Sequence, residues 1–366
     1  MIKIKNLELL RIIACFSIIF YHLLYSKGLL NIADIDLYKN LYSMAKRAPA
    51  SVELFFILSG FFFVYTLNTN FSVIDFVKKK LIRLYPVFIF VFILMMTASL
   101  FGAFIFDLDT NISSLFLLYG TGLVSKSGTI VQWWYVSAMF WNLLLFFVLR
   151  KFIDKKYVDV FAIIALLISY TLAILESKQG HFSATHNKAV FYFYNIGMFR
   201  ALAGISLGYL IGEWYVNNLE KLKTFVFSNF HKGLFTFLET SVLSFLFYFT
   251  LISSKICEND IIFVFAYFLI IVLFLLKQGY ISSFLENDIF PKISRYTYSL
   301  FMSHTFVIYT LKGLVWTKYP LLIAAHPIFN IFITIFLIAL LGIFTYHVVE
   351  EPCSKYLSKQ FITKKL

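Results

Sequence analysis

Residues 49–67 read PASVELFFILSGFFFVYTL and contain one charged side chain in 19 residues. A helix of about 20 apolar residues spans the hydrocarbon core of a bilayer, so this stretch predicts a transmembrane helix. The rest of the chain has the same character, with 60% hydrophobic residues, 14% charged residues and a mean hydropathy of +0.82. A soluble domain of 366 residues has too little core to bury that much apolar surface. The sequence therefore predicts an integral membrane protein.

Nine further apolar stretches are separated by charged or Gly-, Pro- and Asn-containing connectors. Together they predict an all-α, polytopic membrane helix bundle of about ten transmembrane helices, built as a single membrane-embedded domain over residues 1–366. The short alternating segments of an outer-membrane barrel do not occur in the sequence. The ten predicted spans are 7–26, 49–67, 83–106, 131–149, 158–175, 190–212, 234–253, 261–276, 296–316 and 327–349.

Basic residues are distributed unevenly over the connectors. Twenty Lys and Arg residues fall on the side of the N-terminus and nine on the other side. Because cytoplasmic connectors carry the excess of Lys and Arg, both termini are predicted to be cytoplasmic, in a multi-pass protein of the inner membrane. The net charge of +13 has the same origin, so no nucleic-acid partner is expected. Three cysteines without Cys-x-x-Cys spacing indicate no metal site.

Several charged residues lie inside the predicted spans. Insertion of each into the membrane costs at least about 2.5–3.5 kcal/mol, so such residues are expected to have a functional or structural role. Arg11 and His22 are eleven residues apart, which places them on one stripe of the first helix, about 16 Å apart along its axis. Glu53 begins the next helix, which runs the opposite way, so it should lie at the depth of His22. A carboxylate beside an imidazole prepares a general base. Snorkelling for Arg11 and a helix-terminal role for Glu53 remain alternatives.

Further basic residues extend this pattern. Lys80 and Arg83 share one face of the third span at its cytoplasmic end, where positive residues are expected in any case. Arg200 lies in the middle of the sixth span as a functional residue or a counter-ion, and His304 lies half-way along the ninth. The predicted arrangement is a basic cluster at the cytoplasmic end and a His/Glu pair deeper in the membrane. It predicts an anionic donor that enters from the cytoplasm along a polar tunnel. The reaction would then take place inside the membrane.

Six stretches, in the same order, make the chain similar to acyltransferase family three, a family of ten-span membrane acyltransferases. The resemblance covers essentially the whole chain. One departure is Met139, where many relatives carry an acidic residue. The stretches are LELLRIIACFSIIFYH (Arg11 and His22), ELFFILSGFFF (Glu53 to Gly60), KKKLIRLYP (Lys80 and Arg83), WWYVSAMFW (around Trp134), YTYSLFMSH (ending at His304) and HVVEEP (Glu350 and Pro352).

The resemblance implies an acyl-CoA-dependent O-acyltransferase without a bound cofactor. Its donor would be cytoplasmic acetyl-CoA or another acyl-CoA, and its acceptor a hydroxyl of a surface or lipid-linked polysaccharide. His22, Glu53 and His304 are the expected catalytic residues. Arg11, Lys80 and Arg83 would bind the CoA, and Arg200, Trp134 and Glu350 would stabilise the transition state or the structure. The acyl group, the exact acceptor, direct transfer versus an acyl-enzyme, and the oligomeric state stay open. The alternatives are a transporter or flippase of lipid-linked sugars and a non-catalytic membrane subunit.

Overall fold

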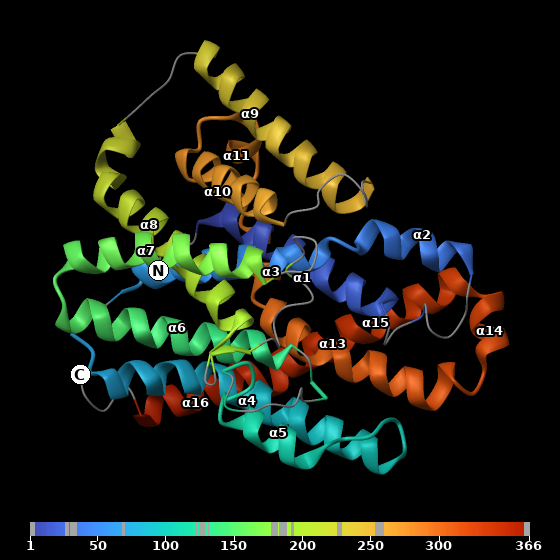
Figure 1. Cartoon of the computed structure of the whole chain (residues 1–366). Helices are drawn as coiled ribbons and strands as arrows, with labels where there is room; N and C mark the ends of the chain where they lie inside the picture. Colours follow the sequence, from blue (N-terminus) through green and yellow to red (C-terminus); the bar gives the residue numbers. More distant parts are fainter. Residues whose placement is uncertain are drawn as a thin grey trace.

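Helices make up nearly all of the protein that the structure, a computed structural model, describes (Figure 1). The described residues are 4–25, 29, 35–67, 70–121, 123, 129–130, 132–176, 182, 189–191, 194–224, 229–252 and 260–361. Within them the one piece of sheet is a short antiparallel pair, β1 (Ala189–Phe191) with β2 (Tyr194–Asn195). The predicted all-α class is confirmed.

Each of the ten predicted spans overlaps a helix of the described residues. By length and apolar composition, seven helical segments of this part of the chain can cross a membrane, and the apolar Ile261–Leu276 is shorter. A polytopic membrane bundle is therefore confirmed, and the number of ten crossings stays a prediction. The helices are α1 (Lys5–Leu24), α3 (Ser51–Tyr65), α4 (Val73–Leu100), α6 (Trp133–Phe152), α7 (Lys155–Leu175), α8 (Ile196–Thr224), α9 (Asn229–Phe247), α10 (Ile261–Leu276), α13 (Thr297–Leu311) and α15 (Pro327–Thr345).

Shorter helices complete the chain between and beyond these segments. Three of them are π-helical turns that extend α9, α13 and α15. The shorter elements are α2 (Asp36–Ala45), η2 (Ala48–Ala50), α5 (Leu108–Leu115), η5 (Tyr248–Ile252), α11 (Tyr280–Phe284), α12 (Ile289–Ser294), η6 (Lys312–Trp316), α14 (Pro320–Ala325), η7 (Tyr346–Glu350) and α16 (Glu351–Phe361).

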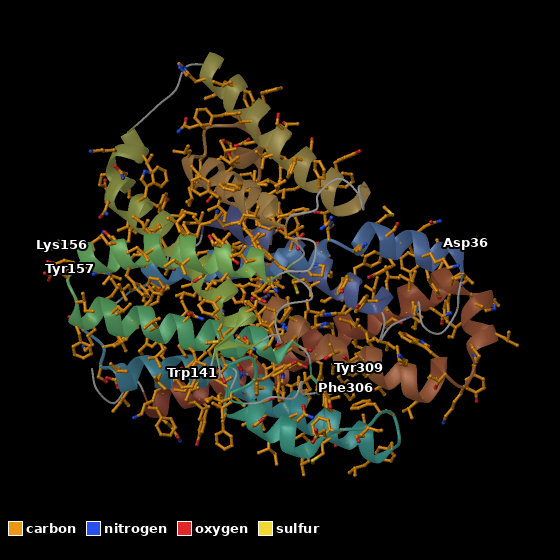
Figure 2. All side chains as sticks on the ribbon, viewed as in Figure 1. Asp36, Trp141, Lys156, Tyr157, Phe306 and Tyr309 are labelled. Atoms are coloured by element: carbon orange, nitrogen blue, oxygen red, sulfur yellow. The ribbon has the colours of Figure 1, made fainter. Side chains whose placement is uncertain are left out.

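The two ends of the bundle differ in what they carry. Figure 1 marks both chain termini on the left and places α2 and α14 on the right. Figure 2 shows Lys156, at the start of α7, on the side of the termini and Asp36, at the start of α2, on the opposite side. The prediction that the terminal side faces the cytoplasm stays a prediction.

The closest packing in the bundle joins α3 to α8. A Cβ on Gly208 would overlap the carbonyl of Ile57, and a Cβ on Gly60 would overlap the carbonyl of Ile205. Gly212 likewise faces Val64, so the two helices run in the same direction with their backbones in contact. Small residues permit such contact between membrane helices, where close van der Waals packing takes the place of the hydrophobic effect. This packing brings the first turn of α3 beside the first turns of α8.

We expect Gly208→Ala to lower the melting temperature of the purified protein, because the added methyl group meets a backbone carbonyl that cannot turn aside. Overpacking of this kind costs about 1–3 kcal/mol. Gly233→Ala is the matched control, because Gly233 in α9 has open space where its Cβ would lie and alanine favours a helix. Equal melting temperatures for the two variants would contradict the backbone contact.

Candidate active site between α1 and α13

Two histidines that are far apart in the sequence meet at the centre of the candidate site. His22 lies in the last turn of α1, and His304 is fully buried in the middle of α13. His22 Nδ1 and His304 Nε2 are 2.9 Å apart, within hydrogen-bonding distance. The rings are nearly parallel, with centroids 5.1 Å apart and an interplanar angle of 8°, so they lie edge to edge as a hydrogen bond between ring nitrogens requires. The structure thus joins two of the three expected catalytic residues.

The hydrogen bonds of His304 assign the tautomers of both rings. Its Nδ1 lies 2.7 Å from the carbonyl oxygen of Phe301, which can only accept, so Nδ1 carries the proton. In neutral His304 the other nitrogen, Nε2, is then the acceptor, and His22 donates through its Nδ1. Neutral His22 therefore holds its lone pair at Nε2. That is the arrangement of a general base whose ring is oriented by a hydrogen bond at the other nitrogen.

A glutamine at the start of α6 fixes the part of α13 that carries His304. The Gln132 side-chain amide donates to the carbonyl of Met302 at 2.9 Å and to the hydroxyl of Thr305 at 2.7 Å. These contacts lie on either side of His304 in the sequence and hold the helix where the imidazole is needed. Gln132 was not anticipated, because a single glutamine before a tryptophan-rich helix carries no recognisable signal.

The carboxylate of Glu53 pairs with Arg200, so the expectation that it orients His22 is wrong. Arg200 Nε donates to Glu53 Oε1 at 2.7 Å, and Nη2 lies at the same distance from that oxygen. The Tyr170 hydroxyl donates to Glu53 Oε2 at 3.0 Å. Glu53 and Arg200 are 0% and 1% exposed. A carboxylate at this depth needs a full opposite charge, which a guanidinium supplies and a neutral imidazole does not. His304 holds His22 instead.

This ion pair is the centre of a larger buried network. Arg200 Nη1 donates to the carbonyl of Phe182 at 2.7 Å, and the Phe182 N–H donates to Asp260 Oδ2 at 2.7 Å. Asp260 Oδ1 accepts from Arg47 Nη1 at 3.1 Å, and both side chains are 5% exposed. The Arg200 guanidinium also lies 5.3 Å from the ring centroid of Trp134. Arg200 and Trp134 therefore belong to the frame around α3 and α8.

The basic residues expected to bind the donor gather at one place. The guanidinium of Arg83 repels the charges of Arg11 and Lys80. Arg11 comes from α1, and Lys80 and Arg83 come from α4. Arg11 also pairs with Glu8 at 3.0 Å. The buried carboxylate of Glu350 interacts with Arg83, and the Ser299 hydroxyl donates to it at 2.5 Å. Repelling cations held close together make a site that favours an anion.

Aromatic side chains connect this basic cluster to the histidines. Tyr135 in α6 interacts electrostatically with Arg11 and Arg83. Its ring lies 5.5 Å from that of Phe301, which lies 5.8 Å from the ring of His304. Met139, the position where the sequence departs from many relatives, accepts a hydrogen bond from the Tyr135 hydroxyl through its sulfur at 3.5 Å. The polar tunnel expected between the two places stays a prediction.

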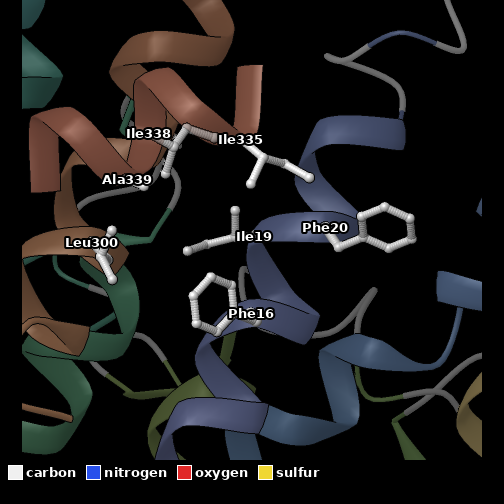
Figure 3. Close-up of a pocket in the computed structure, with 7 residues that line it drawn as sticks. All are labelled: Phe16, Ile19, Phe20, Leu300, Ile335, Ile338 and Ala339. Atoms are coloured by element: carbon white, nitrogen blue, oxygen red, sulfur yellow. The ribbon is translucent and has the colours of Figure 1, made fainter. Parts of the chain in front are cut away.

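An apolar cavity of about 200 Å³ lies one helical turn from the histidine pair (Figure 3). Ile19 precedes His22 by three residues, and Leu300 precedes His304 by four. The lining side chains come from α1, α13 and α15, and all are apolar, so this cavity is suited to a hydrocarbon chain and not to phosphates. They are Phe16, Ile19, Phe20, Leu300, Ile335, Ile338 and Ala339.

Removal of the guanidinium in Arg200→Met should leave Glu53 buried without a counter-charge and cost about 3–5 kcal/mol. The double variant Glu53→Gln, Arg200→Met removes both charges and should recover part of that loss. Thermal unfolding in lipid nanodiscs measures both. Lys355→Met is the control, because its pair with Glu351 is exposed and its loss should not move the melting temperature. A double variant no more stable than Arg200→Met would contradict a pair that is stabilised by charge.

The comparison with known proteins adds one finding. The sequence model of a family described as an acyltransferase domain matches residues 4–347, which include both histidines and the three basic residues of the site but not Glu350. No curated protein and no solved structure matches the chain. Since the match covers far more than half of its length, the chain belongs to acyltransferase family three and is a membrane acyltransferase.

Proposed function

We propose that this protein transfers an acyl group, in the first place acetyl, from cytoplasmic acyl-CoA to a hydroxyl of a surface or lipid-linked polysaccharide. The observation that supports this reaction best is the hydrogen bond between His22 and His304 inside an acyltransferase domain. A sugar hydroxyl is a weak nucleophile until a base removes its proton, and the assigned tautomer leaves His22 Nε2 as that base.

The histidine pair also accounts for the charge that develops during the reaction. When His22 takes the hydroxyl proton, it becomes a cation whose Nδ1–H points at the lone pair of His304 Nε2. The hydroxyl oxygen forms a bond to the thioester carbonyl carbon, the carbon–sulfur bond breaks, and the thiolate of CoA takes the proton from His22. His304 is kept in place for this role by the carbonyl of Phe301 and, through its helix, by Gln132.

The basic cluster formed by Arg11, Lys80 and Arg83 is proposed to bind the phosphates of the donor. Guanidinium and ammonium groups form the strongest hydrogen bonds to phosphate, because both partners are charged. Glu350 beside Arg83 would hold the guanidinium in one orientation. Tyr135 and Phe301 would line the path of the pantetheine arm from this cluster to His22. With the N-terminal side in the cytoplasm, the donor enters where acyl-CoA is made.

We expect His22→Ala and His304→Ala each to lower acyl transfer at least roughly a hundredfold, the usual contribution of a positioned base. Membranes would be assayed with radiolabelled acetyl-CoA and the native glycan of the producing cell. Binding of acetyl-CoA should stay within twofold, because neither imidazole is in the basic cluster. His326→Ala, at an exposed histidine between α14 and α15, is the control. Transfer at the wild-type rate by His22→Ala would reject the assignment of His22 as the base, and no acyl transfer by the wild type would favour a transporter.

The donor site has a separate test. Lys80→Ala and Arg83→Ala should each weaken acetyl-CoA binding roughly tenfold, since a hydrogen bond between charged groups is lost. The loss should be larger at low ionic strength, where charges are screened less. Lys78→Ala is the control, because Lys78 is an exposed lysine of the same helix. Unchanged affinity at low salt would leave Lys80 and Arg83 with a role in membrane orientation only.

A further inference from the structure

A second cavity, of about 190 Å³, is lined by Tyr21, the residue before His22. It is formed where the end of α1 meets α2, the segment before α3 and the start of α10. Tyr21, which lines it, has its ring centroid 5.4 Å from that of His22. The cavity is therefore one side chain away from the proposed base. Its lining residues are Tyr21, Tyr25, Tyr42, Lys46, Arg47, Pro49, Ala50 and Asp260.

One wall of this cavity is a stack of tyrosine rings. Tyr21 and Tyr25 stack at 4.9 Å with an interplanar angle of 17°, and Tyr25 and Tyr42 stack at 5.6 Å with an angle of 29°. Tyr25 is 40% exposed, so the stack is accessible. The face of an aromatic ring carries partial negative charge, which attracts the C–H groups on the face of a sugar ring. The tyrosine hydroxyls can reach the hydroxyls at its edge.

The opposite wall is polar and preformed. The carboxylate of Asp260 and the guanidinium of Arg47 are paired at 3.1 Å and almost completely buried, and exposed Lys46 stands beside them. This pair is connected through the backbone of Phe182 to Arg200, so it is part of the rigid frame. Hydrogen-bond acceptors and donors that lie next to each other are suited to bind the hydroxyl groups of a sugar ring. A hydrocarbon chain would prefer the apolar cavity.

We propose that this cavity, the tyrosine pocket, binds a sugar ring of the acceptor glycan and presents a hydroxyl to His22. The proposal rests on the proposed function and names its acceptor contact. The tyrosine pocket lies at the end of α1 opposite to Arg11, because Tyr25 follows the last turn of that helix. Donor and acceptor therefore approach the histidine pair from opposite ends of the bundle and do not compete for one entrance.

Saturation-transfer difference NMR on the protein in lipid nanodiscs, free of sugar-based detergent, tests the tyrosine pocket without acyl transfer. The probes are the methyl glycosides of glucose, galactose, mannose and N-acetylglucosamine. At least one should receive saturation on the protons of one ring face. The double variant Tyr25→Ala, Tyr42→Ala should weaken its binding roughly tenfold, whereas Tyr25→Phe, Tyr42→Phe keeps the rings and most of the signal.

Two further variants separate this proposal from the proposed function. Tyr157→Ala removes an exposed tyrosine on the side of the termini and should bind the glycoside like the wild type (Figure 2). His22→Ala should also bind it while losing acyl transfer. No saturation of any glycoside by the wild type, or equal saturation in Tyr25→Ala, Tyr42→Ala, overturns the tyrosine pocket and leaves the catalytic assignment standing. Glycoside binding together with full acyl transfer by His22→Ala overturns His22 as the base and leaves sugar binding by the pocket.

Discussion

A carboxylate and a guanidinium, those of Glu53 and Arg200, face each other at 2.7 Å in the part of the molecule that is most completely shielded from water. Neither charge is tolerable there alone, and each fixes the helix that carries the other. The glycines of α8 make the pair possible, because only backbone contact between α3 and α8 brings their first turns so close. From this pair, hydrogen bonds pass through Phe182 to Asp260 and Arg47. These contacts build a frame that joins α3, α8 and the residue before α10.

In the proposed reaction, the donor and the acceptor approach the histidine pair from two directions. The basic cluster and the tyrosine pocket lie toward opposite ends of α1, and the histidine pair lies between them. An enzyme that joins a cytoplasmic donor to an acceptor from the other side must keep the two solutions apart while their reactive groups meet. His304 is fully buried and hydrogen-bonded to His22, so the proposed base lies at a place that is shielded from water on the side of His304. The polar network contributes Arg47 and Asp260 to the wall of the tyrosine pocket.

Much of the fold could be predicted from the sequence, because lipid imposes a simple rule on every segment that crosses it. Runs such as 49–67 must be helices, since no other structure satisfies their backbone groups in hydrocarbon. The cluster of Arg11, Lys80 and Arg83 was also predictable, because depth along a helix follows from residue number. The partner of Glu53 was not, since depth does not say which of several neighbouring helices a side chain faces. The contacts of Gln132 and of the Phe301 carbonyl could not be predicted either, because no sequence motif or spacing indicates them.

The backbone contact between α3 and α8 also bears on how the protein moves. Where Gly208 meets the carbonyl of Ile57, one helix cannot slide past the other without driving side chains into the main chain. The two helices must therefore travel together as one rigid body, with Glu53 and Arg200 inside it. A movement that admits a substrate therefore involves other helices, such as α1 and α13, shifting against that body. The hydrogen bond between His22 and His304 joins these two helices, so a displacement that separates α1 from α13 would break the bond that orients the proposed base.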